Sequence, residues 1–184
     1  PTPSILPPEL ASELDASSGV LPYALSARLL RHFGIAIDHE ELAVSLEEGM
    51  AAAGRIGYPV ALKAASPDIA HKTETGLVKL NLRTGAEFAA AWRELEGILA
   101  LHHADARREG MLVQGMVRSA GGKSGDVVET IVGVNRDGGF GSAVMVGLGG
   151  VFVELLRDVS LELAPLSPEG ARAMIGRPKA AKLL

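Results

Sequence analysis

The sequence predicts an α+β fold with a mainly antiparallel sheet. Two observations favour it: helical spacing with capping residues in the first half, and short apolar strands joined by Gly-rich turns after about residue 127. The expected order is helix, helix, strand, loop, strand, helix and then several strands. We expect two α/β subdomains, with residues 23–110 in a first lobe and residues 111–184 in a second.

The first expected helix spans residues 23–33. Its apolar residues Leu25, Leu29 and Phe33 recur at every fourth position, and Gly34 follows as a stop signal. Residues 1–22 are rich in Pro and Ser with little periodicity, so we expect a linker or tail there.

Two capping boxes predict the next helices. Ser45 with Glu48 precedes a helix that ends near Gly57, and Thr84 with Glu87 precedes a longer helix that reaches about His102. Between these helices we expect a buried strand at 59–63, a polar loop at 65–76 and an alternating strand at 77–82.

Further along we expect a short strand at 111–114 and a Gly-, Ser- and Lys-rich loop at 119–125. Strands at 127–134, 143–146 and 151–156 should follow, and then a helix that begins at Pro168 behind the cap Ser167.

The composition of the 184 residues excludes several classes of function. The formal charge of −4 is spread without a basic patch and aromatics make up 4% of the residues, which argues against a nucleic-acid partner. There is no cysteine, so disulfides, thiolate nucleophiles and Cys-ligated zinc are excluded. No apolar run approaches the roughly 20 residues of a membrane span, and no secretory signal pattern opens the chain. We expect a cytoplasmic location and no membrane association.

Lys63 and His71 are the first candidates for chemistry. Lys63 lies in an otherwise apolar strand, where a charge is costly unless it is paired, for example with a ligand phosphate; it could also lie on the exposed face of the strand. His71 lies in the loop 66–76 among lysine, hydroxyl and carboxylate groups, and an imidazole can accept a phosphoryl group on nitrogen. A solvated loop is the alternative.

Glycines and acidic residues in the second half are further candidates. In the run 147–150, Gly149 and Gly150 would let backbone N–H groups approach an anion, although a tight turn explains the same pattern. Glu154 and Asp158 supply oxygen ligands of the kind that Mg²⁺ prefers. They could equally pair with Arg157 or Arg136 on the surface.

Several of these segments together resemble a known family. The stretch GYPVALKAASPDIAHKTETGLVKLNL, the short MLVQGMV, and the long ETIVGVNRDGGFGSAVMVGLGGVFVELLRDVSLELAPL follow in order, and the sequence ends IGRPKAAKLL. Over residues 23–184 this is similar to the ATP-grasp domain of ADP-forming acetyl-CoA and acyl-CoA synthetases, a domain related to the nucleotide-binding part of succinyl-CoA synthetase.

The resemblance implies a ligase that binds ATP or ADP with Mg²⁺. It implies that acid, CoA and ATP give acyl-CoA, ADP and phosphate, with a phosphohistidine carrying the phosphoryl group. CoA and acyl-CoA would bind to a separate ligase region of the same or a partner chain, in an oligomer. The implied roles are phosphate contact for Lys63, phosphoryl transfer for His71, adenine binding for Gln114 and Met116, nucleotide-site lining for Glu129, and metal or phosphate contact for Glu154 and Asp158.

Some positions depart from the family pattern. Gly115 stands where a glutamate usually follows the hinge glutamine, and Gly76–Leu77 replaces a double glycine. The sequence also stops before an acidic-Asn-Pro motif that supplies magnesium ligands. We therefore expect a C-terminally truncated domain that binds nucleotide poorly by itself and does not turn over.

Two other functions are compatible with this pattern. A degenerate, non-catalytic ATP-grasp module could regulate a multidomain protein acetyltransferase, which the Gly115 and Leu77 departures favour and the retained Lys63, His71 and Glu154 oppose. A fragment of a biotin-dependent carboxylase shares the fold but has no support from the His71 loop.

Overall fold

The computed structural model describes residues 6–37, 39–69, 72, 74–117, 128–150, 158–179 and 181. The chain divides into two compact units, residues 1–116 and 117–184. Within the described residues, no helix is long and apolar enough to span a membrane.

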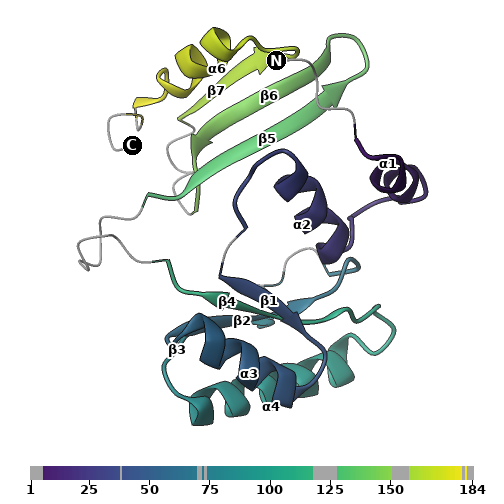
Figure 1. Ribbon diagram of the computed structural model, residues 1–184, viewed down its shortest axis with the longest axis vertical. Helices are drawn as coiled ribbons and strands as arrows, with labels where there is room; N and C mark the ends of the chain where they lie inside the picture. The colour runs from purple at the N-terminus through teal and green to yellow at the C-terminus, as the bar shows by residue number, and fades with distance from the viewer. Residues whose placement is uncertain are drawn as a thin grey trace. The chain divides into compact units, whose positions relative to one another are not determined.

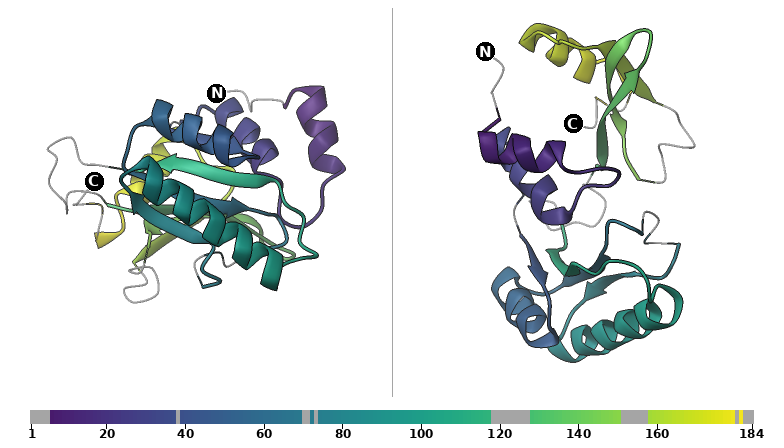
Figure 2. Two further views of the ribbon diagram at one scale, coloured as in Figure 1. Left: turned by 90° about the horizontal axis from the view of Figure 1, so that it is seen from below. Right: turned by 90° about the vertical axis from the view of Figure 1, so that its right-hand side faces the viewer.

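The first unit is built on a four-stranded antiparallel sheet in the order β1–β4–β2–β3 (Figure 1). Two of its helices, α3 and α4, lie against one face of this sheet (Figure 2). The elements in chain order are α1 (Pro8–Asp15), α2 (Tyr23–His32), β1 (Glu40–Ala43), α3 (Leu46–Ile56), β2 (Val60–Ala65), β3 (Val78–Leu82), α4 (Gly85–His102) and β4 (Gly110–Gly115).

The core of the first unit lies between the sheet and helices α3 and α4. Alternate residues of the central strands, including Leu62 and Val113, are fully buried there. They pack with Phe88 and Trp92 of α4, and the Trp92 side chain is only 2% exposed. Gly49 of α3 allows this approach, because a Cβ atom there would lie 2.6 Å from Trp92 Cζ3.

Both predicted capping boxes are present. The Ser45 hydroxyl accepts from the Glu48 N–H at 3.2 Å, and the Glu48 carboxylate accepts from the Val44 N–H at 2.9 Å. Thr84 and Glu87 make the same pair of bonds at the start of α4. Each box satisfies one N–H of the first helical turn, that of Glu48 or Glu87, and also the N–H of the residue before the cap.

Three features of the first unit differ from the expectations. The segment expected to be a linker or tail contains helix α1, whose Leu10 is buried. Strand β1 was not expected, because its four residues show no strand pattern by themselves. Strand β4 was expected to begin the second lobe, but it pairs with β1 and β2 in the first sheet. Residues 111–116 therefore belong to the first unit.

The second unit contains an antiparallel sheet in the order β5–β6–β7, formed by β5 (Thr130–Asp137), β6 (Gly141–Leu148) and β7 (Val159–Leu163). Helix α6 (Pro168–Ile175) follows, and Ser167 caps it by accepting from the Gly170 N–H at 3.0 Å, as predicted. Strand β7 was not expected. The expected loop at 119–125 and strand at 151–156 lie outside the described residues.

Candidate functional site

Lys63 lies on the face of the first sheet that points away from α3 and α4. Its neighbours in β2, Leu62 and Ala64, are buried in the core, so Lys63 is directed to the opposite face. Gln114 of β4 shares that face, because it is paired with Ala61, two residues before Lys63. The ammonium Nζ of Lys63 donates to the Gln114 side-chain oxygen Oε1 at 2.6 Å.

Glu40 and Tyr23 extend this contact. Glu40 of β1 lies directly opposite Gln114, and its Oε2 accepts from the Gln114 side-chain amide. Its other oxygen, Oε1, accepts from the Tyr23 hydroxyl at 2.7 Å. Lys63, Gln114, Glu40 and Tyr23 thus form a half-buried polar chain across three strands and the start of α2, which we call the β-face chain.

Tyr23 fixes the N-terminal end of α2 to this face. Its backbone N–H donates to the Glu109 carboxylate at 3.0 Å, just before β4 begins. Burial, followed by the hydrogen bond to Glu40, raises the pKa of Tyr23 well above its ordinary value. Tyr23 therefore remains a neutral donor to the carboxylate at physiological pH.

The backbone at the end of β4 contains the other residues expected at an adenine hinge. The Gly115 N–H donates to the His39 carbonyl at 2.7 Å. The Met116 N–H reaches the Pro59 carbonyl only at 3.4 Å, which is long for a hydrogen bond of this type.

His71 lies outside the described residues, but the beginning of its loop is well defined. Asp68 accepts from the Arg107 guanidinium, with Nη2 to Oδ1 at 2.6 Å, and from the Arg107 backbone N–H at 2.8 Å. The Asp68 N–H in turn donates to the buried Ser66 hydroxyl at 3.2 Å. After the loop, the Leu77 N–H donates to the Lys72 carbonyl at 2.9 Å.

In the second unit, the structure brings Glu129, Gly149 and Gly150 together. The Gly149 N–H donates to the Glu129 carbonyl at 2.7 Å, just beyond the pairing of Thr130 with Leu148. Gly150 has a left-handed backbone with φ 63°, and a Cβ atom there would collide with Glu129 Oε2. Gly150 therefore leaves room for the Glu129 carboxylate, and Gly149 allows the turn to approach the Glu129 backbone closely.

Asp158 lies at the same end of this sheet, because the Gly147–Val159 pair adjoins it. Its Oδ1 accepts from the Lys179 N–H at 3.0 Å. Its expected partner in metal binding, Glu154, lies outside the described residues. Among the residues that are described, no group of three or more His, Asp or Glu side chains is arranged to hold a metal ion.

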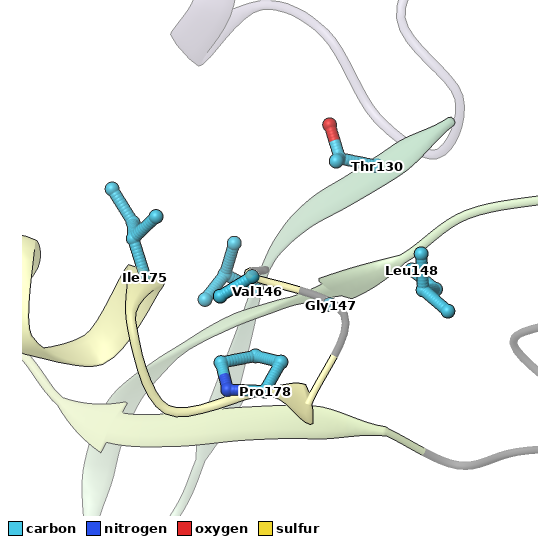
Figure 3. Close-up of a pocket in the computed structure, with 7 residues that line it drawn as sticks. Thr130, Val146, Gly147, Leu148, Ile175 and Pro178 are labelled. Carbon is cyan, nitrogen blue, oxygen red and sulfur yellow. The ribbon is translucent and has the colours of Figure 1, made fainter. Parts of the chain in front are cut away.

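A small apolar pocket lies near this end of the sheet (Figure 3). None of its described lining residues is charged, so this lining does not favour phosphate or a metal ion. Its lining residues are Thr130, Val146, Gly147, Leu148, Ile175, Pro178 and Ala181.

The sequence patterns missed Glu40 and Tyr23. Glu40 and Glu41 are adjacent acidic residues in a four-residue strand, and this pattern does not predict a half-buried hydrogen bond. Tyr23 was identified only as the first residue of a helix. Their role depends on a pairing between residues 74 positions apart, which the sequence alone does not show.

The comparison with protein families decides the classification. The model of an ATP-grasp domain matches residues 13–184, almost the whole chain. The chain belongs to the ATP-grasp family. The match begins inside the segment that was expected to be a linker or tail.

Named relatives of this ATP-grasp chain are CoA ligases. It is 37% identical over 157 residues to the beta subunit of acetate–CoA ligase [ADP-forming] II from Pyrococcus furiosus, and the matched part covers 85% of this chain and 64% of that subunit. The chain spans only 21% and 24% of two similar ligases from Nitrosopumilus maritimus and Archaeoglobus fulgidus.

Solved structures give the same result for this ATP-grasp chain. It is similar to acetyl-coenzyme A synthetase 1 of Ca. Korarchaeum cryptofilum in complex with coenzyme A and Ca-AMPCP. The TM-score is 0.80 at 40% identity, over 96% of this chain and 74% of that one. A second structure of that enzyme contains coenzyme A and Mg-AMPPCP, with its phosphohistidine segment pointing towards the nucleotide-binding site; its TM-score is 0.67 at 38% identity, over 96% and 71% of the two chains.

Proposed function

We propose that this chain is the nucleotide-binding portion of an ADP-forming acyl-CoA synthetase. In the reaction, acid, CoA and ATP give acyl-CoA, ADP and phosphate. The portion described here would bind ATP or ADP and exchange a phosphoryl group with a histidine. The observation that carries the proposal is the contact between Lys63 and Gln114, which joins a predicted phosphate-binding cation to a predicted adenine-binding residue.

The charge and position of Lys63 fit a phosphate contact. Its ammonium lies on a half-buried sheet face whose neighbouring residues Ala61 and Ala65 are buried and apolar. Its partner Gln114 is neutral, so the contact does not cancel the positive charge. A phosphate group close to this face would therefore meet an ammonium that is oriented but not neutralised.

Adenine would be held by backbone groups at the end of β4. The Gln114 oxygen already accepts from Lys63, whereas the Met116 N–H makes a long bond to the Pro59 carbonyl at 3.4 Å. A purine ring could therefore accept a hydrogen bond from the Met116 N–H with little loss of existing hydrogen bonding. This assignment suits the departure at Gly115, which removes a side chain from the hinge.

The second unit would contribute carboxylates and a glycine turn. Glu129 beside Gly149 and Gly150 would line the nucleotide site, with the turn exposing backbone donors to phosphate. Asp158, with Glu154, would hold Mg²⁺, because carboxylate oxygens are the donor type that this hard cation prefers. When bound, Mg²⁺ neutralises phosphate charge.

We assign the phosphoryl transfer to His71. The bond from the γ-phosphorus to the ADP oxygen breaks while a bond to an imidazole nitrogen forms, so that ATP and histidine give ADP and phosphohistidine. The reverse step makes ATP. The protein would contribute mainly positioning and charge neutralisation, as is general for phosphoryl transfer.

CoA and the acyl group would bind elsewhere. The relatives include a protein named as a beta subunit and single longer chains, so the CoA-binding region would be in the same or a partner chain of an oligomer. The relatives reported above are named as CoA ligases or synthetases, which does not favour a regulatory module of an acetyltransferase.

The test uses the protein that contains this chain, with any partner subunit. Lys63→Met should weaken Mg-ATP binding, measured by calorimetry, by at least tenfold, as loss of a charged hydrogen bond of roughly 1.5–3 kcal/mol predicts. Lys79→Met is the matched control, because Lys79 pairs with Glu94 of α4 at 2.5 Å instead of joining the β-face chain. Equal affinities of the two variants would overturn the role of Lys63.

A further assay tests the histidine. His71→Ala should abolish ATP-dependent labelling of this region with the γ-phosphoryl group and acyl-CoA formation. Full labelling in that variant would remove His71 from the mechanism.

A further inference from the structure

We infer that Glu40 is a positioning residue of the nucleotide site, which fixes the direction of the Gln114 amide and thereby the place of the Lys63 ammonium. The inference rests on the proposed function, because it concerns the same lysine. Nothing in the family resemblance assigns a role to Glu40.

The contacts of Glu40 leave its carboxylate little freedom. Oε1 accepts from the Tyr23 hydroxyl, and Oε2 accepts from the Gln114 amide, so each oxygen has its own donor. The donors come from α2 and β4, two elements that are far apart in sequence. Glu40 itself is on β1, directly opposite Gln114 in the ladder.

The carboxylate determines which way the Gln114 amide points. In the observed orientation the amide oxygen accepts from Lys63 and the amide nitrogen donates to Glu40. If the Gln114 amide were rotated by 180°, its NH₂ group would face the Lys63 ammonium, so that two donors would meet. Its oxygen would face the Glu40 carboxylate, so that two acceptors would meet. Both contacts would become repulsive, so Glu40 and Lys63 together select one orientation.

The neutral amide between the two charges has a consequence for binding. A carboxylate in direct contact with Lys63 would compete with phosphate for the ammonium. With Gln114 between them, the negative charge stays one side chain away and still lowers the energy of the ammonium through the amide dipole. Lys63 is therefore held in place without a direct ion pair to Glu40.

The orientation can be tested by NMR, because Gln114 is the only glutamine of the sequence, beside the two asparagines Asn81 and Asn135. The side-chain amide signals of Gln114 in this chain should be shifted from ordinary glutamine values. Glu40→Ala, which introduces no second glutamine, should move those signals towards ordinary values. Glu41→Ala is the matched control, because Glu41 is the next residue and pairs with Arg55 at 2.6 Å.

Binding is the second readout, in the protein that contains this chain. Glu40→Gln should weaken Mg-ATP binding about tenfold, the effect expected when a charge-assisted hydrogen bond becomes a neutral one. Tyr23→Phe should have a smaller effect, since it leaves the Glu40–Gln114 bond in place. Glu41→Gln should leave the affinity within about twofold, as for an exposed ion pair.

The outcomes separate the two proposals. If the wild type binds Mg-ATP and Glu40→Gln binds it equally well, Glu40 is not a positioning residue, although the proposed function stands. If the wild type binds no nucleotide, the proposed function falls, and with it the nucleotide role of Glu40. Ordinary Gln114 amide signals in the wild type would overturn the inference at its first step.

Discussion

Arg107 holds the carboxylate of Asp68 from two directions. Its guanidinium Nη2 donates to Oδ1 at 2.6 Å, and its backbone N–H donates to Oδ2 at 2.8 Å. The segment after α4 is thereby fixed to the beginning of the loop that carries His71. The adjoining backbone bond from the Glu109 N–H to the Ala65 carbonyl, at 2.9 Å, strengthens the same connection.

This pair predicts an acid-sensitive contribution to stability. The side-chain hydrogen bond from Arg107, followed by its backbone N–H, lowers the pKa of Asp68 to about 2. An unfolded aspartate has a pKa of about 3.9, so the stabilisation is present above roughly pH 4 and is lost as the pH falls towards 2. The difference in the free energy of unfolding between wild type and Asp68→Asn, measured by urea denaturation, should become smaller as the pH falls over that range. A pH-independent difference between wild type and Asp68→Asn would contradict the prediction.

Two glycines of helix α3 should respond in opposite ways to alanine. Gly49→Ala places a methyl group 2.6 Å from Trp92 and should destabilise the protein by about 1–3 kcal/mol through overpacking. Gly54→Ala has open space around it and should stabilise by up to about 1 kcal/mol, because alanine is the better helix former. Chemical denaturation followed by fluorescence of Trp92, the single tryptophan, measures both. If Gly49→Ala and Gly54→Ala changed the free energy of unfolding in the same direction, the result would contradict the packing described.

Alanine variants of Gly150 and Gly141 distinguish the effect of backbone strain from the effect of displacing the Glu129 side chain. Both have a positive φ, so alanine should cost about 1–2 kcal/mol of stability at either position. Only Gly150→Ala meets the Glu129 carboxylate, whereas Gly141 has open space. If Glu129 lines the nucleotide site as proposed, only Gly150→Ala should also weaken Mg-ATP binding in calorimetry. Equal binding losses would show that Glu129 is not the cause.

The cap of helix α4 gives a simple stability prediction. Thr84→Ala removes the acceptor of the Glu87 N–H and should lower the free energy of unfolding by about 1 kcal/mol. Thr84→Ser keeps the hydroxyl and should restore most of that loss in urea denaturation. Failure of serine to restore it would mean that the methyl group of Thr84, not its hydroxyl, matters.

Helices with local signals could be predicted from the sequence. The boxes Ser45–Glu48 and Thr84–Glu87 and the pair Ser167–Pro168 are formed by residues close in the chain, and all three begin helices in the structure. Helix α1 lacks any such hydroxyl cap; its N-cap is Pro7 and its side chains make no capping bond. Its composition therefore resembled that of a linker.

Strands defined by distant partners could not be predicted. Strand β1 has the adjacent acids Glu40 and Glu41, a composition that is unfavourable for strands, and it is held by pairing with β4. The same limit applies to the candidate site. Lys63 and Gln114 were identified separately, but the register that brings them together, and the part played by Glu40, depend on tertiary structure.

The place of β4 in the first sheet has a consequence for the growing chain. β1 and β2 are synthesised early, but the strand that belongs between them is made only after β3 and the long helix α4. Until Gly115 has emerged, both earlier strands have open edges that invite pairing with other molecules. A nascent chain or a proteolytic fragment ending before Gly110 should therefore be prone to aggregation, and should depend on chaperones for as long as the central strand is missing.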